Sequence, residues 1–117
     1  MTGVAFEATV GSLFRHHGYV VEQTPNTGDR GVDLLAGKGQ HRIAVQCKRR
    51  LANDIVGPGA IQEVFTGKNL YHCEKTTVVA NSRFSEQTRV MAKQLGVELR
   101  DREWLVQELR EIRTKLS

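Results

Sequence analysis

Apolar residues recur at helical spacing near both ends of the chain. The first stripe consists of Phe6, Val10, Leu13 and Phe14, and the second consists of Leu105, Leu109, Ile112 and Leu116. Because residues three or four positions apart share one helix face, the stripes predict helices over residues 3–17 and from Asp101 to the end of the chain. Thr2 and Asp101 suit the N-cap positions of these helices, and Gly18 suits the end of the first one.

Between the two terminal helices, shorter patterns predict further strands and helices. We expect strands at residues 19–21, 32–36, 41–48, 76–80 and 97–99, and helices at residues 60–72 and 85–95. The sequence Gly37-Lys38-Gly39-Gln40 predicts a hairpin turn between the second and third strands, and residues 51–59 are expected to be a loop. The order αβββαβαβα predicts an α/β fold, in which helices flank a central mixed sheet with an antiparallel hairpin part and a βαβ crossover.

Each helix of the second half carries an apolar side that we expect to face the sheet. These sides consist of Ile61, Val64, Phe65 and Leu70 on the first and of Met91, Ala92 and Leu95 on the second. The leucine stripe of the last helix is expected to pack on the core as well. Because Trp104 and Val106 widen its apolar surface, a dimer interface is the alternative interpretation of that helix.

Three polar residues of the predicted hairpin stand out as candidates for chemistry. Asp33 interrupts an apolar strand, and burying a lone carboxylate is costly unless it has a partner or a metal. The period of two in the next strand places Gln46 and Lys48 on one face and directs Cys47 to the other. If Asp33 points the same way, a carboxylate, an amide oxygen and an ammonium converge, and this set suits Mg²⁺-assisted phosphodiester hydrolysis.

These residues have distinct roles in that hypothesis. Asp33 and Gln46 hold Mg²⁺, for which Mn²⁺ can substitute, and the backbone carbonyl of Cys47 adds a further ligand. Lys48 orients or helps to activate the attacking water and stabilises charge on the phosphate. Glu7, on the first helix, supplies a second carboxylate directly or through a water.

Plainer interpretations of the same residues stay open. Asp33 is also consistent with a structural acid that pairs with Arg30. Gln46 and Lys48 are also consistent with ordinary solvent-facing strand residues. Glu7 also fits an exposed acid in the first turn of a helix, where the helix dipole favours negative charge.

Length and composition place the chain among ordinary globular proteins. Its 117 residues suit one domain, so we expect a single domain over residues 1–117. Hydrophobic residues make up 39% and charged residues 26%, which argues against disorder, and no apolar run approaches the length of a membrane span. Cys47 and Cys73 are too few for a disulfide framework or a cysteine-rich zinc site, so we expect a soluble cytoplasmic protein with free thiols.

The formal net charge of +4 permits a polyanionic partner. Basic and acidic residues balance before Lys48, so the whole excess comes from Lys48 onward. The run Lys48-Arg49-Arg50, next to the proposed phosphate site, predicts contacts with the phosphate backbone of such a partner, whereas a solvated strand end is the ordinary interpretation of so short a run. Lys38 and Lys68 are further candidate backbone contacts.

Residues 28–50, with the sequence GDRGVDLLAGKGQHRIAVQCKRR, resemble the catalytic core of Mrr-type restriction endonucleases, which belong to the PD-(D/E)xK nuclease superfamily. Further matching segments follow in the family's order: FEATVGSLFRHHGYVVEQTPNTGDRG, VGPGAIQEVFTGK, VVANSRFSEQTRVMAKQLGVEL and DREWL. Each piece alone is weak, but their combination is specific. The resemblance covers nearly the whole chain and implies a restriction-endonuclease-like fold.

The resemblance also implies roles for single residues. It places the family's Asp on Asp33, its Glu or Gln on Gln46 and its Lys on Lys48. The acid of the first helix, an accessory polar position and the Asp of the GDxGxD turn fall on Glu7, Gln62 and Asp29. Gln46 stands where much of the wider superfamily has a carboxylate, although Gln is a recognised variant in the Mrr branch. Full-length Mrr enzymes have a separate N-terminal DNA-recognition domain, which the matching segments do not include, so we expect the choice of target to stay open.

Residues and resemblance together predict a Mg²⁺-dependent endodeoxyribonuclease, with DNA as its partner and without a membrane. One site cuts one strand, so double-strand cleavage requires a homodimer or two successive nicks. One alternative is a structure-specific nuclease such as a Holliday-junction resolvase, which shares this fold and these residues. The other alternative is a DNA-binding subunit that does not cleave.

Overall fold

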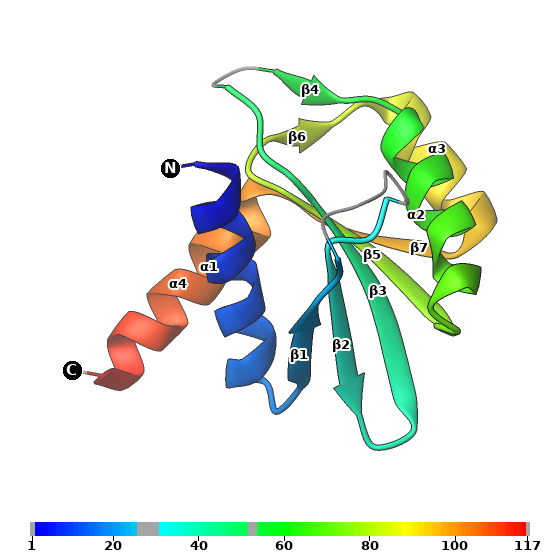
Figure 1. Ribbon diagram of the computed structural model, residues 1–117. Helices are drawn as coiled ribbons and strands as arrows, with labels where there is room; N and C mark the ends of the chain where they lie inside the picture. Colours follow the sequence, from blue (N-terminus) through cyan, green and yellow to red (C-terminus); the bar gives the residue numbers. More distant parts are fainter. Residues whose placement is uncertain (1, 26–30, 52–53, 117) are drawn as a thin grey trace.

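A five-stranded mixed sheet forms the centre of the molecule, and helices cover both of its faces (Figure 1). The computed structural model describes residues 2–25, 31–51 and 54–116. The elements follow one another as α1 (Gly3–His16), β1 (Val20–Gln23), β2 (Leu34–Lys38), β3 (His41–Lys48), β4 (Ile55–Val56), α2 (Gly59–Leu70), β5 (Lys75–Ala80), β6 (Arg83–Phe84), α3 (Glu86–Leu95), β7 (Val97–Arg100) and α4 (Arg102–Leu116). None of the described helices is both long and apolar enough to cross a membrane.

The strands of the main sheet lie in the order β1-β2-β3-β5-β7. The first three pair antiparallel, whereas β3, β5 and β7 pair parallel through connections that contain α2 and α3. Helices α2 and α3 pack on one face of the sheet, and α1 and α4 pack on the other (Figure 1). This arrangement confirms the predicted mixed α/β fold.

Strand β3 separates two apolar layers, because its successive side chains point to opposite faces. Ala44 packs with Ile61 and Val64 of α2, whereas Val45 packs with Val10 of α1. All five side chains are fully buried. Burial of a valine or isoleucine side chain stabilises a fold by roughly 1.5–3 kcal/mol, so both layers hold β3 in place.

The local signals at helix ends and turns are confirmed. Thr2, Ser85 and Asp101 each accept a backbone N–H from the residue three positions further on. The predicted hairpin turn joins β2 to β3, and its Gly39 has a φ of 63°. These features can be predicted from the sequence, because capping and turn formation depend on residues only a few positions apart.

Some expectations from the sequence are wrong. Residues 51–59 are not all loop, because Ile55–Val56 form β4, which pairs with β6. Leu70 and Leu95 do not face the sheet: they are 56% and 37% exposed, because each is the last residue of its helix. Leu109 is 47% exposed, because the inward side of α4 consists of Leu105, Glu108 and Ile112 and Leu109 lies beside it.

Asp33 lies directly before β2 rather than inside it, since the strand begins at Leu34. Its backbone N–H donates to the carbonyl oxygen of Val45 at 2.8 Å, and its own carbonyl oxygen accepts from the N–H of Thr24 at 3.1 Å. The backbone pairing therefore continues through Asp33 and fixes it beside β3.

Candidate active site

Asp33 lies beside the last residues of β3, and its Oδ2 accepts the backbone N–H of Cys47 at 2.7 Å. Burial raises the pKa of Asp33 above its usual value, and the charge of Glu63 adds to this effect. The hydrogen bond from Cys47 and the charge of Lys48 act in the opposite direction. A buried carboxylate of this kind is stabilised by a further positive charge, so the position suits a cation.

Gln46 and Lys48 meet on the face of β3 that α2 covers. Gln46 Nε2 donates to Oε2 of Glu63 at 2.6 Å, and Lys48 Nζ donates to the same oxygen at 3.2 Å. Both contacts confirm that the two side chains share one strand face. Burial acts to raise the pKa of Glu63, but these hydrogen bonds and the charges of Lys48 and Arg50 outweigh it and lower the pKa.

The amide oxygen of Gln46 lacks a partner in the interior. Gln46 is 3% exposed, and among the described residues its Oε1 meets no hydrogen-bond donor. Such a group is destabilising by about 1–3 kcal/mol, whereas a neutral carbonyl oxygen is a good ligand for Mg²⁺. The described chain holds no cluster of three or more His, Cys, Asp and Glu side chains suited to a metal. The Asp33 carboxylate and the unpartnered amide oxygen of Gln46 are nevertheless oxygen ligands of the kind that Mg²⁺ prefers, so the chemistry of both residues fits a cation.

Glu63 is the residue of this site that the sequence interpretation missed. The family pattern led to its neighbour Gln62, which the structure places on the exposed side of α2. The close approach of α2 to the segment before β2 depends on Gly31. Its φ is 69°, and a Cβ atom there would lie 2.4 Å from the backbone carbonyl carbon of Glu63. The available signal was that Glu63 is the one acidic residue of α2.

Glu7 and Cys47 border the site from the side of α1. Cys47 packs in the apolar layer under that helix, opposite the face of Gln46 and Lys48, as strand alternation predicts. Burial raises the pKa of Glu7, and the charge of Asp33 raises it further. Burial, with smaller effects from Asp33 and Glu7, raises the pKa of the Cys47 thiol far above its usual value. Glu7 is therefore within electrostatic reach of Asp33, and the thiol is protonated at neutral pH.

Asn81 holds the backbone of the basic run that follows β3. Its Oδ1 accepts the N–H of Arg50 at 2.7 Å, and its Nδ2 donates to the carbonyl oxygen of Arg50 at 3.0 Å. The N–H of Asn81 also donates to the carbonyl oxygen of Lys48 at 3.3 Å. Arg49 is exposed. The sequence interpretation missed Asn81, because this contact joins positions 31 residues apart.

The other predicted residues lie away from the site or outside the described chain. Lys38 is at the hairpin end, where its Nζ donates to the carbonyl oxygen of His17 at 3.0 Å. The two ends of an eight-residue strand such as β3 are roughly 23 Å apart, so Lys38 is remote from Lys48. Lys68 Nζ lies over the ring of Phe65, 4.3 Å from its centroid. Asp29 lies outside the described residues.

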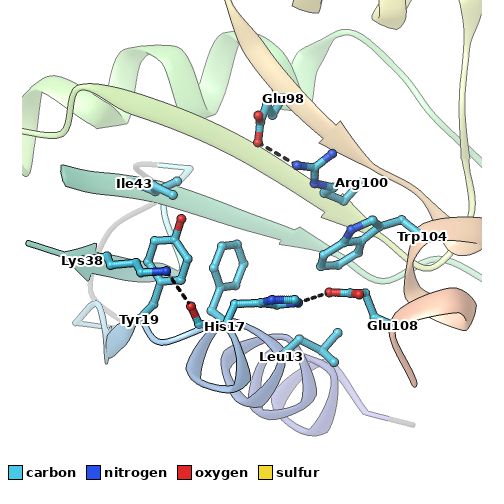
Figure 2. A pocket seen from close by; sticks show the side chains of 10 residues that line it. Leu13, His17, Tyr19, Lys38, Ile43, Glu98, Arg100, Trp104 and Glu108 are labelled. Carbon is cyan, nitrogen blue, oxygen red and sulfur yellow. Dashed lines mark hydrogen bonds and ion pairs between the residues drawn. The ribbon is translucent and has the colours of Figure 1, made fainter. Parts of the chain in front are cut away.

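A cavity of about 410 Å³ lies between the end of α1, the hairpin, β7 and α4 (Figure 2). Its charged side chains engage one another: His17 binds Glu108, and Arg100 binds Glu98 at 3.1 Å. None of the residues around Asp33 lines this cavity. Its interactions therefore connect structural elements at a distance from the candidate active site.

The mixed sheet flanked by helices has the restriction-endonuclease fold, and its central hairpin carries Asp33, Gln46 and Lys48. The chain matches the family model Mrr_cat, described as restriction endonuclease, over residues 1–109. It therefore belongs to the Mrr_cat restriction endonuclease family and is classed as an endonuclease. This match confirms the resemblance found in the sequence. PD-(D/E)xK-type nucleases generally use divalent metals.

Solved structures share the fold of this chain. The DNA modification-dependent restriction endonuclease AspBHI has a TM-score of 0.77 and 23% identity, over 92% of this chain and 31% of that chain. The MspJI restriction endonuclease in complex with a 27-mer oligonucleotide has a TM-score of 0.65 and 21% identity, over 93% of this chain and 27% of that chain. A repair endonuclease from Pyrococcus abyssi has a TM-score of 0.60 and 18% identity, over 86% of this chain and 47% of that chain. The chain thus spans less than half of each of these proteins. No curated protein sequence matches the chain.

Proposed function

We propose that this domain is a Mg²⁺-dependent endodeoxyribonuclease with a role in restriction or DNA processing. The observation that carries the proposal is the buried amide oxygen of Gln46, which has no donor among the described residues. Gln46 stands directly before Cys47, whose N–H binds the Asp33 carboxylate, and two positions before Lys48. Membership of a restriction endonuclease family supports DNA hydrolysis. The oligonucleotide complex of MspJI supports DNA as the substrate.

Asp33 and Gln46 would hold the Mg²⁺, together with the backbone carbonyl of Cys47. The N–H of Cys47 fixes one oxygen of the Asp33 carboxylate and leaves the other for binding. Glu7 would add a second carboxylate directly or through a water. When bound, the cation would draw charge from the scissile phosphate and lower the pKa of the attacking water.

Lys48 would act on the attacking water and on the transition state. Its Nζ is fixed by Oε2 of Glu63 at 3.2 Å, and its side chain is 20% exposed, so the ammonium lies at the solvent edge of the site. An ammonium has three hydrogens, and the contact with Glu63 uses one of them. The remaining donors orient the water and stabilise negative charge that develops on the phosphate oxygens.

Arg49 and Arg50 would bind the DNA backbone beside the scissile phosphate. Because Asn81 fixes the backbone of this run, the guanidinium groups start from a defined position next to Lys48. Contacts of this kind add affinity that falls as salt rises. One site cuts one strand, so cutting both strands calls for a symmetric homodimer or two successive nicks.

Plasmid nicking in Mg²⁺ or Mn²⁺ tests the proposal with the variants Asp33→Ala and Lys48→Ala. Each variant should lose at least about 100-fold in rate, the usual loss when one stabilising group of a transition state is removed. Glu74→Ala, an exposed change at the hairpin end, is the matched control and should cut like the wild type. The proposal is wrong if the wild type cuts no better than Asp33→Ala on supercoiled, linear and branched DNA.

The same assay separates the roles that share this site. Strong competition by a four-way junction against linear duplex would assign a structure-specific nuclease. Cutting that ignores branching would favour a restriction or general processing role. Binding of DNA without any cutting by the wild type would assign a DNA-binding subunit.

A further inference from the structure

The amide of Gln46 has two ends of nearly the same shape and opposite chemistry. Its oxygen accepts hydrogen bonds and can bind a cation, whereas its NH₂ group carries two donors and cannot. A carboxylate at this position would have two equivalent oxygens. A site that uses Gln46 as a cation ligand therefore needs a neighbour that distinguishes the two ends of the amide.

Glu63 is such a neighbour. Its Oε2 accepts from Gln46 Nε2 at 2.6 Å and from Lys48 Nζ at 3.2 Å. A carboxylate that is paired with an ammonium has only acceptor capacity, so it binds the NH₂ end of the amide and repels the oxygen. Turning the Gln46 amide by half a rotation would bring two acceptor oxygens into contact.

The orientation that Glu63 selects leaves Oε1 of Gln46 buried without a donor among the described residues. The side chain of Glu63, in contrast, is 48% exposed, so its contact with Gln46 is not a consequence of core packing. A partly exposed carboxylate thus fixes a buried amide with its oxygen unsatisfied. This is the arrangement that a ligand for the oxygen would require.

We propose that Glu63 is a positioning residue that directs the amide oxygen of Gln46 toward the divalent cation. The inference rests on the proposed function and adds to it a residue outside the Asp33, Gln46 and Lys48 set. By binding the NH₂ group, Glu63 makes a glutamine serve as an oxygen ligand. Because Lys48 shares the same carboxylate oxygen, Glu63 fixes the amide and the ammonium relative to each other.

Calorimetric Mn²⁺ titration without DNA tests this role in Glu63→Gln and in the double variant Gln46→Glu with Glu63→Gln. In the single variant, position 63 no longer selects the orientation of the Gln46 amide, because an amide there both donates and accepts. Its Mn²⁺ affinity should fall by about 10- to 100-fold, the usual effect of losing a group that orients a metal ligand. In the double variant the amide at position 63 donates to one oxygen of the carboxylate at position 46, and the other oxygen of that carboxylate is left for the cation. Its affinity should return to the wild-type range.

The control is Glu74→Gln, which removes one exposed charge at the hairpin end and should bind Mn²⁺ like the wild type. Wild-type binding with an unchanged affinity in Glu63→Gln would overturn the positioning role and leave the proposed nuclease standing. A double variant as weak as Glu63→Gln would also overturn it. A wild type that neither binds Mn²⁺ nor cuts DNA would overturn the role and the nuclease together.

A second measurement uses the wild type alone, so it does not depend on the folding of a variant. The side-chain NH₂ hydrogens of Gln46 should exchange slowly with solvent in ¹⁵N spectra and stay protected when Mg²⁺ is added. They face Glu63 in both states if the positioning role is correct. Faster exchange of these hydrogens on Mg²⁺ addition would show that the amide turns away from Glu63, which would overturn the role.

Discussion

Asp33 and Glu7 occupy positions where ionisation is unfavourable in the folded protein. Burial raises the pKa of each carboxyl group, and the charge of Asp33 raises the pKa of Glu7 further. Groups placed for a ligand at the expense of stability are common at functional sites. In the absence of a cation, the domain should therefore be less stable at neutral pH than the same fold without these charges.

Asp33→Asn tests that consequence in protein kept free of metal by a chelator. Because the folded pKa of Asp33 lies above its ordinary value of 3.8, ionisation destabilises the fold. This effect is absent at pH below the unfolded pKa and complete above the folded pKa. The variant should therefore raise Tm at pH 7, and the difference should shrink as the pH falls toward 4.

Glu74→Gln is the control for that measurement. A hydrogen bond from His41 lowers the pKa of Glu74, so neutralising this residue should not raise Tm at pH 7. A Tm for Asp33→Asn that is equal to or below that of the wild type at pH 7 would contradict the prediction.

The residues of the site differ in how far the sequence could predict them. Gln46 and Lys48 were assigned to one face, because the period of a strand is fixed by its backbone. Glu63, the residue of α2 that binds both, was not predictable in the same way, because its position depends on how the helix is rotated relative to the strand. One position along a helix turns the side chain by about 100°, and this separates Glu63 from the expected Gln62.

At the scale of elements, α2 lies close to the segment before β2 at Gly31. The left-handed φ of 69° and the 2.4 Å between an added Cβ and the Glu63 backbone both exclude a larger residue. The contact sets the distance between the helix that carries Glu63 and the hairpin that carries Gln46. Its removal should therefore affect both stability and the site.

Gly31→Ala should be more destabilising than Gly39→Ala, which has a similar φ of 63° and no atom within 4 Å of the added Cβ. Left-handed backbone costs a non-glycine residue about 1–2 kcal/mol in either variant. Displacement of α2 should add about 2 kcal/mol more in Gly31→Ala, in the range of overpacked sites. Urea unfolding measures both losses. Equal losses in the two variants would mean that the close approach has no energetic effect.

The short strands β4 and β6 show where element prediction from sequence fails. Each has two residues, which is too short for an alternating pattern to be recognised. Val56 is nevertheless fully buried, and its carbonyl oxygen accepts the N–H of Ser85 at 3.1 Å, at the start of α3. The long strand β3 was predicted with its observed bounds, because eight residues display the period clearly.

Across the whole molecule, α4 is attached to α1 through His17 and Glu108 (Figure 2). The side chain of Glu108 is 11% exposed and that of His17 is 48% exposed. The contact joins residues 91 positions apart, so local sequence patterns could not reveal it. It holds the C-terminal helix against the layer that borders the candidate site.

His17→Ala should destabilise the fold by about 1–3 kcal/mol, because it leaves the buried Glu108 without this hydrogen bond. His41→Ala is the matched control, since its partner Glu74 is 53% exposed. That exposed pair should contribute less than about 1 kcal/mol. Urea unfolding at pH 7 compares the two variants. A loss in His17→Ala no greater than in His41→Ala would show that the pair does not anchor α4.

Cys47 stands between Gln46 and Lys48 in the chain, yet its thiol packs under α1. A shift of β3 by one residue would exchange the two faces, placing sulfur in the site and forcing an amide and an ammonium into the apolar layer. A sulfur ligand would favour softer ions such as Zn²⁺ over Mg²⁺. The metal selectivity of the proposed site therefore depends on the pairing register of β3 with β2 and β5 as much as on the ligands themselves.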